Sequence, residues 1–371
     1  MTQSLDGKTK KVKKGISDVP VNMEIHVPLS PAKTTVVYDS YWRFAALRQE
    51  VFFNRIEGRT YPWTADPILS KYKFTNVYRA ADRVSQYLIK NVIYNDTLPE
   101  TPREVFFRVM LFKLFNKIET WELLTSKVGQ VTFEDYNFKV YEKVLSAAMA
   151  SGKRIYSAAY IMPSAKSSFG YERKHGNHLK LIESMIRQET YKRMADALTM
   201  QQSFEILKAF PSLGDFLAYQ FLIDINYSTV TNFSESEFVV PGPGAKGGIS
   251  KCFANTAGLS EVEIIKLMTD RQEIEFERLG LSFKSLWGRR LQLIDCQNVF
   301  CEVDKYARVK HPEVKGNSDR LRIKQMFKMN SKAIDFWFPP KWQLNGIISE
   351  IKLAKYDRKP LPQPAYDELK K

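Results

Sequence analysis

The feature that most constrains the fold of this chain is a helical spacing of apolar residues, which recurs from residue 38 to residue 309. The segment 105–124, VFFRVMLFKLFNKIETWELL, is apolar on most sides, as expected of a helix at the centre of a bundle. Strand patterns are short and weak, at residues 35–38 and 238–240. The spacing therefore predicts a mainly α fold. Further helical patterns occupy residues 38–55, 133–149, 178–198, 204–223, 261–279 and 284–309.

The composition narrows the classes of protein that fit. Hydrophobic residues make up 44% of the 371 positions and charged residues 26%, which excludes global disorder. Lys and Arg number 56 against 41 Asp and Glu, a net charge of +15, which favours a polyanionic partner, nucleic acid ahead of a membrane surface. Three cysteines fit a reducing cytoplasm, and the histidines show no zinc spacing, so we expect a cytoplasmic protein without metal or other cofactor.

The ends of the chain differ from its middle. Residues 1–33 contain a lysine cluster and three prolines, which predicts a flexible basic arm that is either a solvated end or an attractor of phosphates. Residues 34–345 are expected to form one helical domain, and residues 346–371 a C-terminal tail with three prolines. No window of 18 apolar residues and no secretory signal is present, so no membrane association is expected, nor an obligate protein partner.

Two turn-rich segments are typical of phosphate contacts. The segment 210–218, FPSLGDFLA, places Ser212 and Gly214 just before an apolar helix, where backbone N–H groups can hold a phosphate. A plain connection between helices is the alternative. The segment 238–249 has four glycines in seven positions and is not a Walker A loop. Lys246 and Lys251 flank its glycines and suit phosphates, unless the segment is only a structural turn.

The strongest candidate for an active-site wall lies in the segment 291–308, LQLIDCQNVFCEVDKYAR. Asp295, Asn298 and Glu302 fall on one side of a helix, together with Lys305, within about 80° of one another. Two carboxylates, an amide and an amine among apolar neighbours are typical of an active site. The alternative is the solvated side of an amphipathic helix.

A further segment, residues 61–83, puts aromatic and amide side chains beside arginines. Trp63 and Phe74 could stack on a base that has left its duplex, and Asn76 could read its edge. Core packing would equally explain both aromatics.

The segments 62–89, 241–253 and 295–308 together resemble a phage-linked DNA-modification family. It is clade 2 of the alpha-glutamyl/putrescinyl thymine pyrophosphorylases, also described as the helical domain found with hydroxymethyluracil DNA kinases. The resemblance covers roughly residues 35–330 and implies a fold similar to helix-hairpin-helix DNA glycosylases, with 210–218 as the hairpin. It implies that some members transfer an amino acid to DNA, displacing pyrophosphate from a modified thymine. It also implies a phage-defence relative that excises glucosylated hydroxymethylcytosine.

The sequence departs from hairpin glycosylases in its catalytic residues. The Asp expected about twenty residues after the hairpin glycine is replaced by Ser234, and neither an activating lysine nor a four-cysteine iron–sulfur motif is present. The kinase domain fused to some relatives is also not seen. The catalytic carboxylate is therefore expected to be Asp295, Glu302 or Asp224.

Three functions follow from these observations. The first is a DNA glycosylase that excises a hypermodified base from phage DNA in defence. In it Asn298, Gln297 and Asn76 would read the base, Trp63 or Phe74 would stack on it, and Ser212 and Gly214 would hold the backbone. The second is an amino-acid:DNA transferase whose Lys246, Lys251, Lys305 and Arg308 would hold the leaving pyrophosphate. The third is a DNA-binding protein without catalysis. The glycosylase is the expectation, because the chain carries no kinase or carrier segment.

Overall fold

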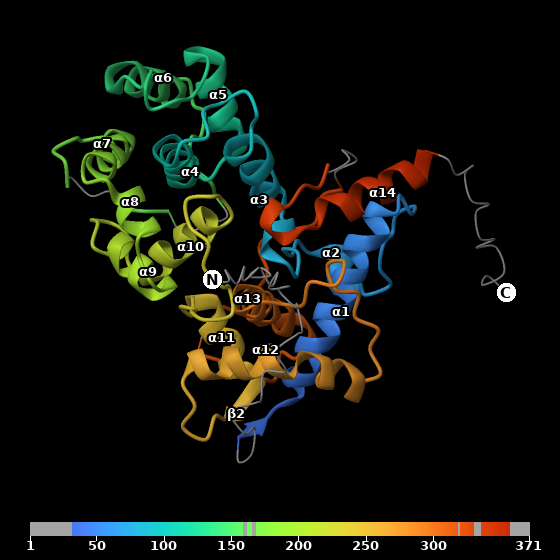
Figure 1. Cartoon of the computed structure of the whole chain (residues 1–371). Coiled ribbons are helices and arrows are strands. Elements are labelled where there is room, and N and C mark those ends of the chain that lie inside the picture. Colours follow the sequence, from blue (N-terminus) through green and yellow to red (C-terminus); the bar gives the residue numbers. More distant parts are fainter. Residues whose placement is uncertain (1–31, 159–161, 165–167, 318–319, 330–334, 357–371) are drawn as a thin grey trace, which may run out of the picture.

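A computed structural model describes residues 32–158, 162–164, 168–317, 320–329 and 335–356. Helices dominate these residues, and their only sheet has two short antiparallel strands (Figure 1), so the expectation of a mainly α fold is confirmed. The elements are, in chain order, β1 (Lys33–Thr34), α1 (Val36–Ile56), α2 (Pro67–Lys71), η1 (Arg79–Ala81), α3 (Arg83–Tyr87), η2 (Leu88–Ile93), α4 (Pro102–Phe115), α5 (Ile118–Val128), α6 (Phe138–Ala150), α7 (Lys174–Arg187), α8 (Thr190–Ala195), α9 (Met200–Lys208), α10 (Asp215–Asn226), α11 (Pro243–Cys252), β2 (Phe253–Asn255), α12 (Glu261–Arg278), α13 (Leu293–Lys310), η3 (Pro340–Trp342) and α14 (Asn345–Tyr356).

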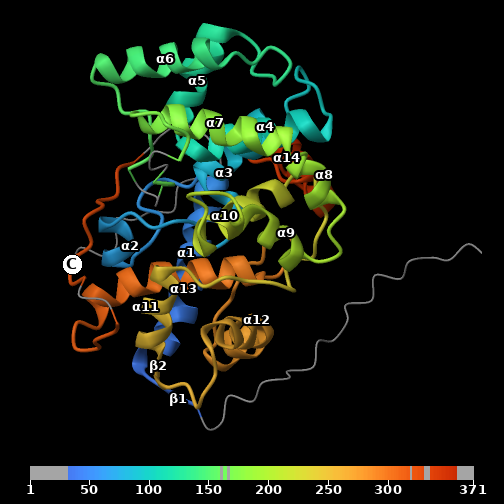
Figure 2. The same cartoon turned by 90° about the vertical axis from the view of Figure 1, so that its left-hand side faces the viewer.

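The helices gather in two groups. Figures 1 and 2 show α4 to α9 together in one lobe, and α1, α11, α12 and α13 together in the other. In the first lobe α4 contacts α5, α7, α8 and α10. In the second, α13 contacts α1, α11 and α12, and each of these also contacts the others. Each lobe is therefore built around one central helix.

The central position of α4 follows from its sequence. Every residue from Glu104 to Phe115 is buried, including the charged side chain of Arg108. Arg108 is accommodated because its guanidinium donates to the carbonyls of Val92 and Pro99, at 2.9 and 2.8 Å. The segment 105–124 is thus a bundle centre as predicted only in its first part, up to Phe115. The segment forms two helices, and in the second, α5, Glu119 and Glu122 are exposed. Asn116 adopts a left-handed conformation with φ 48° and ends α4.

Other helix boundaries also differ from the expected ones, for local reasons. The helix expected at 178–198 is broken at Glu189, whose φ of 49° starts a new helix. The helix expected at 284–309 begins only at Leu293, because Gln292 and Asp295 form a reciprocal capping box there. The strand expected at 35–38 is mostly the first turn of α1, and 238–240 forms no strand.

The expected end segments fall mainly outside the described residues. Residues 1–31 and 357–371 are not described, so the basic arm and most of the tail stay predictions. Helix α14 begins at Asn345, at the predicted domain boundary, and Ile348 within it is buried in the core.

Candidate active site

The polar side of α13 meets the backbone of one loop. Asp295 accepts a hydrogen bond from the N–H of Arg79 at 2.9 Å. Asn298 donates to the carbonyl of Asn76 at 2.8 Å, and Glu302 accepts from the N–H of Thr75 at 3.1 Å. The side chains predicted to lie together on this helix therefore hold the segment 75–79 in place.

Beside this contact lies a cluster of four charged side chains, three of which keep partial access to solvent. It comprises Arg48 on α1, Asp82 at the start of α3, and Glu302 with Lys305 on α13. The carboxylate of Glu302 is buried and pairs with the ammonium of Lys305 at 2.5 Å. We call these four residues the charged cluster.

Asp82 is the most perturbed member of the charged cluster. Desolvation by the surrounding protein raises the pKa of its carboxyl group to about 7, and the charge of Glu302 adds to this effect. The N–H of Asn76, which donates to Asp82 at 2.8 Å, and the guanidinium of Arg48 act in the opposite direction. Burial also lowers the pKa of Arg48 to about 10. A carboxyl group that titrates near neutral pH and keeps solvent access can serve as a general base.

Sequence reasoning missed Asp82 and Arg48. The available signal was weak: Asp82 is a single acid between Arg79 and Arg83, inside the segment that carries the family resemblance. Arg48 lies in the amphipathic helix α1 and has no local feature that separates it from a surface arginine.

Asp224 does not belong to the charged cluster. Its carboxylate is buried and receives both terminal nitrogens of Arg79 at 2.8 Å and the ammonium of Lys113 at 2.9 Å. Burial acts to raise the pKa of Asp224, but these two cations outweigh it and hold the pKa below its usual value. The geometry is that of a structural ion pair, and we leave Asp224 out of the proposed catalytic set.

Asp295 is likewise engaged by the backbone. Its two oxygens accept from the N–H groups of Arg79 and Gln292, at 2.9 and 3.1 Å, and only 5% of the residue is exposed. Burial raises the pKa of this carboxyl group to about 7, against the lowering effect of both N–H donors. Its position at the first turn of α13 gives it a capping role.

The side chains predicted to contact the base differ in how far they are buried. Asn76 is buried and donates to the carbonyl of Ala81 at 2.7 Å. Phe74 is buried against Phe44 and Tyr306, and Gln297 is buried beside Cys301. Of the predicted set, Asn298 and Trp63 keep partial exposure.

The glycine-rich segment is helical from Pro243 onward. Residues 243–252 form helix α11, which packs tightly on α13. A Cβ atom added at Gly248 would lie 2.1 Å from the carbonyl oxygen of Phe300, and one at Gly244 would lie 3.1 Å from the sulfur of Cys301. Gly244 and Gly248 therefore allow two helices to pack closely, where the sequence suggested a close contact to a phosphate.

The predicted phosphate-binding cations differ in availability. Lys251 is buried and binds Asp304 on α13 at 2.9 Å, so we leave it out of the proposed site. Arg308 also pairs with Asp304 and donates to the carbonyl of Arg322. Lys246 is half exposed, with Glu261 at 3.8 Å. Lys305 alone of these four joins the charged cluster.

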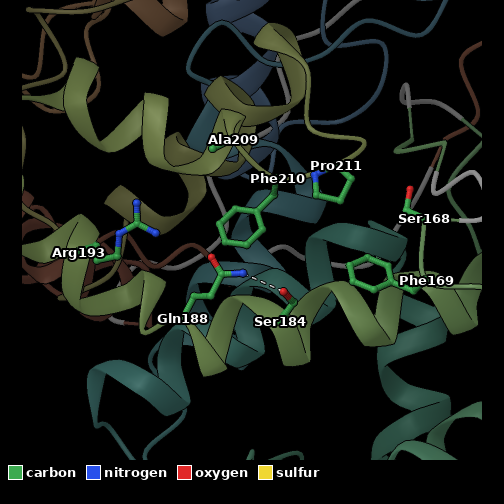
Figure 3. A pocket seen from close by; sticks show the side chains of 8 residues that line it. All are labelled: Ser168, Phe169, Ser184, Gln188, Arg193, Ala209, Phe210 and Pro211. Atoms are coloured by element: carbon green, nitrogen blue, oxygen red, sulfur yellow. Dashed lines mark hydrogen bonds between the residues drawn. The ribbon is translucent and has the colours of Figure 1, made fainter.

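The predicted hairpin lies between α9 and α10. Ser212 adopts a φ of 68°, and Gly214 is the exposed N-cap of α10. Next to the turn is a cavity of about 300 Å³, where Phe210 lies opposite Gln188, which donates to Ser184 at 3.0 Å (Figure 3). The full lining comprises Ser168, Phe169, Ser184, Gln188, Arg193, Ala209, Phe210 and Pro211. None of these residues belongs to the charged cluster.

The described residues contain no group of three or more His, Cys, Asp or Glu side chains that could hold a metal ion. In the same part of the chain, no helix has the length and apolar character needed to span a membrane.

Comparison with known proteins gives the family. The protein-family model described as "5-hmdU DNA kinase, helical domain" matches residues 35–316 of this chain. A 5-hmdU DNA kinase of Bacillus phage SP10 is 28% identical over 297 residues, which is 74% of this chain and 46% of that protein. The chain thus spans about half the length of this relative. No solved structure matches the chain significantly.

These matches correct the expected function. The sequence predicted a DNA glycosylase, a hydrolase that excises a modified base. This prediction is wrong, because the family model and the phage relative are both named for the 5-hmdU DNA kinase, a protein of hydroxymethyluracil modification. The alternative drawn from the sequence, a role in thymine hypermodification, agrees better with them. The likeness to hairpin glycosylases stays a prediction. With more than half of its length matched by the family model, this chain belongs to the family of the 5-hmdU DNA kinase helical domain.

Proposed function

We propose that this protein acts on DNA that contains a modified thymine, and transfers an amine or amino acid to a pyrophosphorylated 5-hydroxymethyl pyrimidine. The observation that carries the proposal is the charged cluster, in which Asp82, with a pKa near 7, lies within electrostatic reach of Arg48 and Glu302. The family and a relative named 5-hmdU DNA kinase support modified DNA as the substrate class.

The reaction needs one base and a stabilised leaving group. The amine nitrogen attacks the exocyclic methylene carbon, and a C–N bond forms while the C–O bond to pyrophosphate breaks. Pyrophosphate leaves with the electrons of that bond, and the proton of the attacking nitrogen passes to the carboxylate of Asp82.

The cations of the charged cluster suit the negative charge that develops on the leaving group. Lys305 is held by Glu302 at 2.5 Å and keeps partial exposure, as does Arg48. A positively charged group held in position before the reaction stabilises a departing pyrophosphate more than mobile water does. Asn298, partly exposed on the same side of α13, is the proposed contact to the base.

The other residues predicted to contact phosphates are proposed to bind the DNA backbone and to take no part in the reaction. A net charge of +15 favours DNA, and Lys246 with the turn at Ser212 and Gly214 are the proposed contacts to its backbone. The base must leave its stack to reach the charged cluster, which costs a few kcal/mol.

Mass spectrometry of nucleosides tests the proposal. The protein is incubated with an oligonucleotide carrying one pyrophosphorylated 5-hydroxymethyldeoxyuridine, with and without an amino acid or diamine. A heavier nucleoside and free pyrophosphate are expected only when the amine is present. Asp82→Asn should slow the transfer by about 10²- to 10⁴-fold. Asp96→Asn, at an exposed position, is the matched control and should leave the rate unchanged.

A DNA-binding role without catalysis is the second candidate. It is favoured by the engagement of Asp295 and Asn298 with backbone groups, which leaves fewer polar side chains free to react. In that case no product forms with any amine, and Asp82→Asn binds the same oligonucleotide as tightly as the wild-type protein.

A further inference from the structure

Aromatic side chains from two distant segments meet at the surface. The rings of Tyr61 and Phe327 lie parallel, with centroids 6.1 Å apart and an interplanar angle of 9°. Trp63 meets Tyr61 edge-on at 5.6 Å, and the guanidinium of Arg55 lies 5.6 Å from the centre of the Trp63 ring. Tyr61 is 40% exposed and Trp63 is partly exposed, so both rings reach solvent.

Backbone pairing holds the two segments together. The N–H of Lys73 donates to the carbonyl of Gln325, and the N–H of Phe327 donates to the carbonyl of Lys71, both at 3.0 Å. This is a short antiparallel bridge centred on Tyr72 and Met326. The aromatic rings and the two paired segments therefore form one continuous surface.

The same surface is basic and partly apolar. Lys71, Lys73, Arg322, Lys324 and Lys328 are all exposed, and neither 67–73 nor 320–329 contains an acidic residue. Three large apolar side chains are exposed on the second segment, Leu321 at 78%, Met326 at 49% and Met329 at 58%. We call Tyr61, Trp63, residues 71–73 and residues 320–329 the aromatic–basic surface.

We propose that the aromatic–basic surface binds an unpaired strand of DNA next to the modified base. Cations attract the phosphates, and exposed rings and apolar side chains offer a stacking platform for bases. A duplex would hide its base faces and leave the rings without a partner. An acidic protein would use the cations but not the flat rings. The proposal rests on the proposed function, and adds to it the strand state of the substrate.

The position of this surface relative to the charged cluster supports the proposal. Thr75, which donates to Glu302, is only two residues beyond Lys73, a span of at most ~7 Å. On the other side, Arg308 of α13 donates to the carbonyl of Arg322. A strand lying on the aromatic–basic surface would thus pass beside the charged cluster.

Fluorescence anisotropy with unmodified DNA tests the inference without any transfer chemistry. The probe is a labelled single strand of about 16 nucleotides, compared with the duplex of the same sequence. The single strand is expected to bind more tightly. Tyr61→Ala should weaken its binding about tenfold and leave duplex binding unchanged.

Charge variants measure the phosphate contacts. Lys73→Gln combined with Lys324→Gln should reduce the slope of log affinity against log salt by about 1.4, since each phosphate contact to a single strand contributes about 0.7. Lys139→Gln combined with Lys143→Gln removes the same charge from exposed positions at α6, in the other lobe, and should leave the slope unchanged.

Two results would overturn the inference. One is equal affinity for single strand and duplex, and the other is an equal effect of the two lysine pairs. Variants are compared only after circular dichroism shows wild-type helicity. Because the probe carries no modified base, loss of transfer activity in the mass-spectrometry experiment leaves this result intact, and failure here leaves the transfer reaction standing.

Discussion

Arg79 donates hydrogen bonds to Asp224 from both terminal nitrogens of its guanidinium, in the interior of the protein. Each nitrogen lies 2.8 Å from one carboxylate oxygen. The backbone N–H of Arg79 donates to Asp295 at the same time. One residue therefore ties α10 in one group of helices to α13 in the other, next to the loop that borders the charged cluster.

Asp224→Asn should destabilise the fold by about 3–5 kcal/mol, because it leaves Arg79 and Lys113 buried without their carboxylate. Urea unfolding measures the change, and Asp96→Asn should stay within about 0.5 kcal/mol of wild type. If Asp224→Asn instead abolished transfer at unchanged stability, Asp224 would be catalytic, as the sequence suggested.

Transfer activity should rise with pH through about 7, because Asp82 must be ionised to accept a proton and burial raises its pKa to that value. Initial rates between about pH 5.5 and 8.5 give the profile. The residual activity of Asp82→Asn should lack this rise. A rise that survived in Asp82→Asn would assign the titration to another group.

Asp295 should make stability fall as pH rises. Its folded pKa of about 7 exceeds the ordinary value of 3.8, so the folded state binds more protons than the unfolded state between these values. The stability of wild type relative to Asp295→Asn should therefore decrease by up to about 1.4 kcal/mol per pH unit from about pH 4 to pH 7. Urea unfolding at several pH values tests the sign, and an increase would contradict it.

Gly248→Ala should destabilise the fold by about 3 kcal/mol or more, because the new methyl group meets a backbone carbonyl oxygen 2.1 Å away and the two helices must separate. Gly346→Ala is the matched control: it lies in α14 with nothing within 4 Å, and should be neutral or stabilising by up to about 1 kcal/mol. Thermal unfolding compares the two, and equal effects would mean that α11 does not pack on α13 as described.

Much of this architecture could be predicted from local patterns. The burial of α4 followed from apolar residues on all its sides, and the shared side of Asn298, Glu302 and Lys305 followed from helical spacing. The helix breaks at Asn116 and Glu189 escaped prediction, because a left-handed residue interrupts a helix without changing the apolar spacing around it. The packing role of the glycines in α11 escaped for a similar reason: glycine permits a turn and a close helix contact equally well.

The sequence by itself determined the helical class, the core helix α4, the polar side of α13 and, through its resemblance, the family. Only the tertiary structure decided what that polar side meets. Thr75 and Glu302 are 227 positions apart and touch because α1, the loop after α2 and α13 pack together. The pKa of Asp82 is decided in the same way, since desolvation depends on which distant segments surround a carboxylate. The local sequence pattern does not indicate which distant segments will surround a residue. For that reason Asp82 and Arg48 could be identified as candidate site residues only from the tertiary structure.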